Sequence, residues 1–237
     1  MAQKQTILRI GLPPGKRLYP SEFRELLAKI QNMPCALFHV DENRNPLNER
    51  PGIRVAGAQG WVGLVADEDN KLLLREATGA AIMAVSERIG QSCQVQIEER
   101  EFGLKPTPEP KVYWVREMAI KQRHKSARDK NPEALIRDRI LTSLEATCDK
   151  YGIDCPTAEV LGVQTIEAVR PRGLRLMTTA GITPESVMLV DAKVMMHADL
   201  DGMWFVGNLT ARGYGRIIKD RPGMRFDGER SSMGVLQ

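Results

Sequence analysis

Residues 201–223 read DGMWFVGNLTARGYGRIIKDRPG, and this stretch decides how the whole chain is interpreted. Two apolar runs flank a loop in which Gly207, Gly213 and Gly215 surround Arg212. Glycine lets the backbone turn sharply or approach another group closely, because it has no side chain. Arginines and exposed backbone amides both donate hydrogen bonds to phosphate oxygens, so such a loop suits a polyanion. The alternative is a β-hairpin whose glycines only form its turn.

Basic residues continue beyond this glycine-rich loop. Between residues 204 and 225 there are five Lys or Arg and one acidic residue, Asp220. We therefore predict that the loop and its basic flank bind a polyanion through Arg212, Gly213, Gly215, Arg216 and Lys219.

The N-terminal part of the chain alternates between strand-like and helix-like patterns. Residues 20–32 begin with Pro-Ser and repeat apolar side chains at helical spacing, and a second helical pattern over residues 70–90 ends at Gly90. Strand-like runs lie around these helices, at residues 5–13, 34–41, 53–67 and 91–102. The order β-α-β-β-α-β predicts an α+β protein with a ferredoxin-like domain over residues 1–104.

The middle of the chain is basic. Residues 103–110, GLKPTPEP, are expected to form a linker because their prolines oppose a helix. From residue 111 to 139 there are nine Lys or Arg against four Asp or Glu, although the net charge of the whole chain is only +4. We interpret residues 111–156 as a basic helical finger that binds nucleic acid; an ordinary pair of solvated helices is the alternative. Its predicted contacts are Lys121, Arg123, His124, Lys125 and Arg128.

The C-terminal part, residues 157–237, is β-rich, with short strand-like runs separated by Gly, Pro and Asp. It contains the glycine-rich loop. No long helix is expected there, so a second ferredoxin-like unit would be degenerate.

Composition limits the class of protein. The 237 residues, 42% of them hydrophobic, suit one large domain or two small ones. No segment approaches the roughly 18 apolar residues of a membrane span, and no signal peptide is evident. We therefore expect a cytoplasmic protein whose four cysteines are reduced thiols. Because no two cysteines stand at CxxC spacing, we also expect no zinc site.

The loop resembles the C-terminal glycine-rich loop of the RAMP superfamily of CRISPR proteins. That loop has two G-h-G triplets around a spacer that contains Lys or Arg, and residues 205–215, FVG-NLTAR-GYG, fit its spacing, except that Phe205 replaces the first glycine. With the β-α-β-β-α-β start and the basic middle, the chain is similar to the CRISPR RNA-processing endonucleases of type IV systems.

This resemblance implies an endoribonuclease that needs neither a metal nor another cofactor. In such enzymes a 2′-hydroxyl of the CRISPR repeat RNA attacks the adjacent phosphate and leaves a 2′,3′-cyclic phosphate. The protein often stays bound to the RNA hairpin, so the repeat RNA and a backbone subunit of an effector complex are implied partners. The reaction needs a base, an acid and a cation beside the phosphate.

His39 and Arg24 are the catalytic residues that we predict. Histidine exchanges protons near neutral pH, and arginine binds phosphate. His39 ends the second expected strand, on the same face as Leu37, so a buried structural histidine is the alternative. Tyr19 and Arg17 in the first loop are further candidates.

Two other functions remain open. The same superfamily supplies non-catalytic subunits that hold an RNA terminus and cap a complex, and the glycine-rich loop does not separate these roles. A small-molecule regulatory domain is the other alternative, but it would leave the basic charge of the middle segment unexplained.

Overall fold

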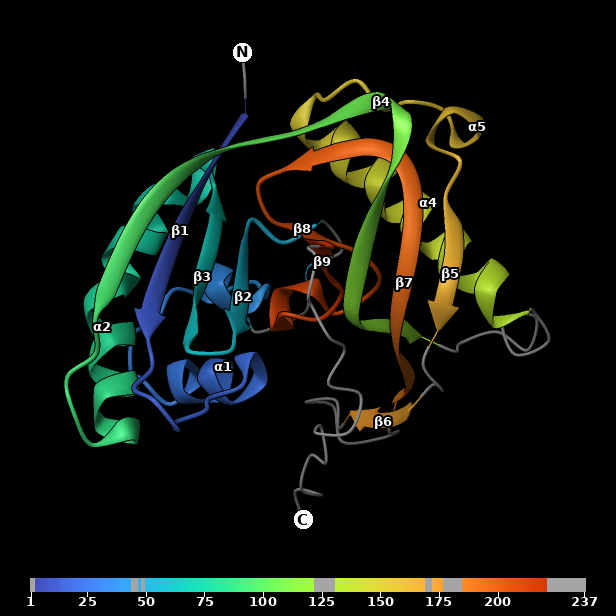
Figure 1. Cartoon of the computed structure of the whole chain (residues 1–237). Helices are drawn as coiled ribbons and strands as arrows, with labels where there is room; N and C mark the ends of the chain where they lie inside the picture. The colour runs from blue at the N-terminus through green and yellow to red at the C-terminus, as the bar shows by residue number, and fades with distance from the viewer. Residues whose placement is uncertain are drawn as a thin grey trace.

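The computed structural model of the chain describes residues 3–43, 47, 50–121, 131–168, 172–176 and 185–220. Its elements form two halves that share one long strand, β4 (Val95–Lys121). In Figure 1 the N-terminal half lies on the left, the C-terminal half on the right, and β4 passes from one to the other.

The N-terminal half has the β-α-β-β-α-β order that the sequence predicts. Its strands are arranged β2-β3-β1-β4, and each neighbouring pair is antiparallel. The helix α2 places Leu74, Ala77, Ala81 and Val85 in the core and ends at Gly90, whose φ of 82° is readily adopted only by glycine. The bounds of these elements are β1 Gln3–Gly11, α1 Pro20–Ala28, β2 Ile53–Ala58, β3 Trp61–Asp67, a short 3-10 helix η2 Glu68–Asn70 and α2 Lys71–Ile89.

Two strand predictions in this half were wrong in detail. The run at residues 34–41 is a 3-10 helix, η1 (Cys35–Phe38), instead of a strand. The run at residues 53–67 is a hairpin of two strands, β2 and β3, which turn at Gly60 with a φ of 83°. The second strand of the β-α-β-β-α-β order is instead β2, at the edge of the sheet beside β3, and η1 packs Leu37 against the helical core.

The C-terminal half is a second, degenerate ferredoxin-like unit. Its strands are arranged β9-β4-β7-β5, the same spatial order of fourth, first, third and second strand as in the first half. The helix expected between the third and fourth strands is replaced by the glycine-rich loop. The bounds are α4 Pro132–Tyr151, α5 Ala158–Leu161, β5 Gln164–Ala168, β6 Arg172–Leu176, β7 Glu185–Asp201, β8 Trp204–Phe205, a 3-10 helix η3 Thr210–Arg212 and β9 Arg216–Lys219.

The linker prediction at residues 103–110 was wrong, because these residues belong to β4. The strand pairs with β1 up to Phe102 and with β7 from Gly103 onward. Pro108 and Pro110 are tolerated because the pairing with β7 is irregular between Pro106 and Lys111, where proline's missing N–H costs no regular ladder bond. The boundaries expected near residues 104 and 111 thus fall inside one strand; the division into three domains stays a prediction.

The segment predicted as a helical finger, residues 111–156, has a different structure where it is described. Residues up to Lys121 continue β4. The helix α4 begins after Asn131, whose side chain accepts a hydrogen bond from the Glu133 amide, and it ends at Gly152. Four apolar side chains of α4 pack into the core of the second half: Leu135, Ile136, Ile140 and Leu144. This helix therefore supplies the long helix that the sequence did not predict for the C-terminal half.

No helix within the described ranges is both long and apolar enough to cross a membrane.

Candidate functional site

The glycine-rich loop lies between the two halves, where η3 contacts α1, η1 and β2. Gly213 has a φ of 87°, and a Cβ atom there would lie 2.7 Å from the Pro20 Cβ and 2.9 Å from the Val55 carbonyl oxygen. Gly215 has a φ of 75°, and a Cβ would overlap the Val206 carbonyl. These glycines therefore do what the sequence suggested: they let the loop approach another backbone closely.

The C-terminal half holds the loop on its other side. The Gly207 amide donates to the Ser143 hydroxyl of α4 at 2.9 Å, and the Asn208 amide donates to the Ala119 carbonyl of β4 at 2.7 Å. Tyr214 is buried beside Ala119. The loop is thus fixed to one half and presented to the other.

A small pocket lies where the loop meets the start of α1. It is lined by Tyr19, Pro20, Ser21, Glu117, Arg212, Gly213 and Tyr214. The amino end of a helix favours anions, because its first amides lack intrahelical partners. Glu117 enters from an irregularity in β4 with a φ of 50°, and its amide donates to the Asp191 carboxylate at 2.6 Å.

Arg24 and Arg212 bring two guanidinium groups to this junction. The pKa of Arg24 is lowered to about 10, first by burial and second by the positive charge of Arg212. One Arg24 amino group donates to the Phe38 carbonyl at 3.1 Å, while its Nε is buried without an acceptor. Arg212 makes no side-chain hydrogen bond or ion pair to any residue that the structure describes. Two neighbouring cations of this kind favour a bound anion.

His39 follows η1 and does not lie on a strand. Its φ of 56° is left-handed, which is uncommon outside glycine, and its amide donates to the Ala36 carbonyl. His39 follows Phe38, whose carbonyl accepts a hydrogen bond from Arg24, so the two predicted catalytic residues belong to segments that are in contact. His39 does not line the pocket, whereas the alternative candidate Tyr19 does and is 39% exposed. Arg17 is exposed in the loop before α1.

Of the residues predicted to bind RNA in the basic finger, only Lys121 lies within the part of the chain that the structure describes. Lys121 ends β4, and its amide donates to the Asn208 side-chain oxygen at 3.1 Å, which places it beside the glycine-rich loop. The other predicted contacts of the finger lie outside the described residues: Arg123, His124, Lys125 and Arg128.

Arg216 and Lys219 lie at opposite ends of β9. Arg216 is directed at the N-terminal half, where it donates to the Gly57 carbonyl at 2.8 Å and its guanidinium carbon lies 5.4 Å from the Trp61 ring centroid. The Lys219 ammonium donates to the Asp199 carboxylate at 2.8 Å. Arg216 therefore adjoins the junction, and Lys219 does not.

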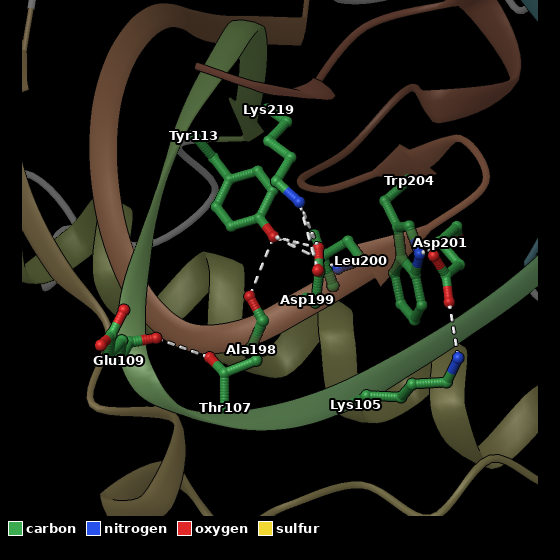
Figure 2. Close-up of polar contacts among 10 residues, drawn as sticks. All are labelled: Lys105, Thr107, Glu109, Tyr113, Ala198, Asp199, Leu200, Asp201, Trp204 and Lys219. Atoms are coloured by element: carbon green, nitrogen blue, oxygen red, sulfur yellow. Dashed lines mark hydrogen bonds and ion pairs between the residues drawn. The ribbon is translucent and has the colours of Figure 1, made fainter. Parts of the chain in front are cut away.

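Figure 2 shows what surrounds Lys219 instead. The Tyr113 hydroxyl donates to the Ala198 carbonyl at 2.9 Å and lies 3.4 Å from the Asp199 carboxylate that Lys219 binds. Burial, first of all, raises the pKa of Tyr113 above its usual range. The hydrogen bond from Lys219 is the largest of the effects that lower the pKa of Asp199. This cluster joins β4, β7 and β9, which is a structural role.

Glu117 and Ser21 line the pocket although the sequence did not single them out. Glu117 sits among alternating strand residues, and nothing in its neighbours indicates an irregularity between Val115 and Met118. Ser21 stands out in the sequence only as a helix-start residue. Within the described ranges, no three His, Cys, Asp or Glu side chains are grouped as metal ligands would be.

The chain has two ferredoxin-like units that share a strand and a glycine-rich loop at their junction. These features define the RAMP class of CRISPR proteins, which is the class that the sequence predicts. Known proteins place the chain within this class. The family model of the type IV CRISPR-associated endonuclease Csf5 matches residues 3–222. The chain therefore belongs to the Csf5 family of type IV Cas6 endonucleases.

Solved structures agree with this assignment. A structure of Csf5, described as a CRISPR-Cas type IV Cas6 crRNA endonuclease, is 34% identical with a TM-score of 0.82, and the match covers 92% of this chain and 100% of that chain. A crystal structure of Cas6b shares the fold at 12% identity, with a TM-score of 0.60 and coverage of 93% and 100%. A second Cas6b crystal structure, also 12% identical, has a TM-score of 0.52 and coverage of 92% and 100%. No match was found among the curated proteins.

Proposed function

We propose that the chain cuts CRISPR repeat RNA without a metal ion, by attack of a 2′-hydroxyl on the adjacent phosphate. The 2′ oxygen forms a bond to phosphorus, the bond from phosphorus to the 5′ oxygen breaks, and the products are a 2′,3′-cyclic phosphate and a 5′-hydroxyl. The observation that carries this proposal is that Arg24 of α1 and Arg212 of η3 come from the two halves on elements in contact, and that Arg212 lines the pocket at the start of α1.

Each step of this reaction has a candidate group at the junction. Arg24 and Arg212 would hold the phosphate and stabilise the negative charge that grows on it in the transition state. His39 would exchange the proton of the 2′-hydroxyl or of the departing 5′ oxygen. Tyr19 is the alternative for either proton transfer, since its side chain lines the pocket.

We assign binding of the RNA hairpin to basic residues and glycines of the glycine-rich loop, of β9 and of the segment before α4. These residues are Lys121, Arg123, His124, Lys125, Arg128, Arg212, Gly213, Gly215, Arg216 and Lys219. Proteins meet double-stranded RNA through phosphates and shape, because its major groove is deep and narrow. We further propose that the protein keeps the cut hairpin and joins an effector complex through a backbone subunit.

A non-catalytic subunit that only holds the RNA is the second candidate. The left-handed backbone of His39 favours it, because that residue lies outside the pocket and would then serve to end η1. In both candidate functions Arg24 and Arg212 bind a phosphate of the RNA. The two functions differ in whether that phosphate reacts.

One experiment separates them. The protein is incubated in EDTA with the repeat RNA of its host's CRISPR array, and with a copy that carries one 2′-deoxy nucleotide at the cut site. Cleavage of the first RNA only, with a cyclic phosphate on the product, is the expected result. Tight binding of both RNAs with no cleavage would mean that the chain is a binding subunit.

A further inference from the structure

Four arginines from both halves lie near one another next to the glycine-rich loop. Arg9 comes from β1, Arg100 and Arg116 from the two parts of β4, and Arg216 from β9. The guanidinium carbons of Arg9 and Arg216 lie 4.9 Å and 5.4 Å from the centroid of one ring, Trp61. We call these four residues the arginine cluster.

Arg9 and Arg100 lie on the face of the N-terminal sheet that α1 and α2 leave uncovered, and Arg216 reaches this sheet from β9. Leu8 and Ile10 of β1 pack under those helices, whereas Ile7 packs against Met203 and Phe205 of the C-terminal half. Because side chains alternate along a strand, Arg9 shares the face of Ile7. The side chains of Arg100 and Arg116 are 49% and 41% exposed, so solvent and ligands reach them.

The carboxylates that contact the cluster are shared between several donors. Glu98 pairs with both Arg9 and Arg100, at 2.9 Å and 3.0 Å. Asp191 lies 3.8 Å from Arg116 and also accepts the Glu117 amide. Glu98 therefore shares its single negative charge between two guanidinium groups.

The fold brings like charges close together in the arginine cluster. Arg116 and Arg216 are direct partners across β4 and β9, an arrangement that destabilises a sheet when both residues carry the same charge. The Nε atoms of Arg9 and Arg216 are buried without an acceptor. Burial, followed by the charges of Arg9, Arg100 and Arg116, lowers the pKa of Arg216 to about 10. An anion bound here would relieve each of these costs.

The arginine cluster and the pocket are connected through neighbouring residues of β4 and of the glycine-rich loop. Arg116 precedes the pocket residue Glu117, and Arg216 follows Gly215. The Gly215 amide donates to the Arg116 carbonyl at 3.0 Å, which joins the two segments. Because Arg116 is next in the chain to a pocket residue, a polyanion that binds at the pocket meets a second positive site nearby.

We propose that Arg9, Arg100, Arg116 and Arg216 bind the phosphates of an unpaired RNA segment next to the cut. The inference rests on the proposed function only in taking RNA as the ligand. Contacts from guanidinium groups to phosphate oxygens carry no sequence information, so this site is expected to add affinity without sequence preference. Trp61 holds two of the arginines in place through cation–π contacts.

The test uses a single-stranded probe with no hairpin, a fluorescent 12-nucleotide oligouridylate, whose binding is followed by anisotropy over a series of KCl concentrations. The variant Arg100→Gln/Arg116→Gln changes two exposed side chains, and Arg75→Gln on α2 is the matched control because it is also exposed and lies on another surface. The double variant is expected to bind about tenfold more weakly, and its salt slope is expected to fall by about 0.7 for each phosphate that the protein no longer neutralises. Equal binding and equal slopes for both variants would overturn the proposal.

Cleavage of the repeat RNA is scored separately, so the two proposals fail separately. If the repeat RNA is bound but not cut, while oligouridylate binding depends on Arg100 and Arg116, the proposed reaction is wrong and the second site stands. If the repeat RNA is cut normally and the substitutions at Arg100 and Arg116 leave oligouridylate binding unchanged, only the proposal of a second RNA-binding site is wrong.

Discussion

Arg24 of α1 and Arg212 of the glycine-rich loop, from opposite ends of the chain, lie close enough for the charge of Arg212 to add to burial in lowering the pKa of Arg24 to about 10. Two cations that repel each other in the folded protein make folding less favourable and anion binding more favourable. This relationship links the fold to the proposed chemistry, because only the packing of one half on the other brings the pair together.

Replacing Arg212 with Gln should slow cleavage without weakening the fold. The guanidinium has no side-chain partner among the described residues, so the free energy of unfolding should change by less than about 0.5 kcal/mol. Loss of one group that stabilises a reacting phosphate typically costs about 10²–10³ in rate. Urea unfolding and single-turnover cleavage measure the two effects, with Arg75→Gln as a control. A large loss of stability with an unchanged rate would show that Arg212 is structural.

Gly213→Ala should separate the loop from α1. A Cβ at this position would press on Pro20 and the Val55 carbonyl, and the φ of 87° disfavours alanine, so we expect a loss of about 1–3 kcal/mol in the free energy of unfolding. Cleavage should fall further than RNA binding does. Gly79→Ala in α2 is the matched control: it has open space around it and should raise stability by roughly 0.5–1 kcal/mol. Equal effects of the two substitutions would contradict the close packing of the loop.

His39→Asn tests the proton-transfer role, because asparagine tolerates the left-handed backbone at this position. If His39 moves a proton, the variant should lose about 10²–10⁴ in rate, and the wild-type inflection of the rate between about pH 5 and 8 should disappear. Tyr19→Phe is measured beside it. A pH profile unchanged in His39→Asn and flattened in Tyr19→Phe would transfer the role to Tyr19.

Lys219→Met should weaken the fold in a pH-dependent way. The pKa of Asp199 is lowered chiefly by its hydrogen bond from Lys219, so the pair contributes stability above the ordinary carboxyl pKa of about 3.9 and loses it as pH falls through the lowered value. Because both side chains are partly exposed, we expect a difference of only about 0.5 kcal/mol at pH 7. Urea unfolding at several pH values should show this difference shrinking toward acid pH; a difference that is constant with pH would rule out the ion pair as its source.

Regular local patterns could be predicted from the sequence, and long-range packing could not. The apolar stripe and terminal glycine of α2 sufficed to place it. Pro106 and its neighbours indicated a linker, but the irregular pairing opposite them lets β4 continue, and pairing partners are not visible in a local pattern. The run around Leu37 looked like a strand because a short apolar run fits a 3-10 helix equally well.

The candidate site could be predicted only in part, because its local patterns are visible in the sequence and its long-range contacts are not. Arg212 and its glycines stood out because glycine next to arginine signals a close approach to an anion. Arg24 could be selected as a candidate only because it lies on the polar face of a predicted helix. Its proximity to Arg212 is visible only in the folded structure. Glu117 enters the pocket through an irregularity in β4 that its neighbours in the sequence do not reveal.

The most direct test of the account is a double-mutant cycle on Arg24 and Arg212, measured as the single-turnover rate of repeat RNA cleavage in EDTA. Arg24→Gln keeps an amide that can donate to the Phe38 carbonyl, and thermal unfolding checks that each variant is folded. If both arginines hold one phosphate, each single variant should be slow and the double variant little slower than the worse of the two. Independent losses that multiply, or a wild-type rate in either single variant, would contradict the claim that the two halves of the protein meet on a shared phosphate.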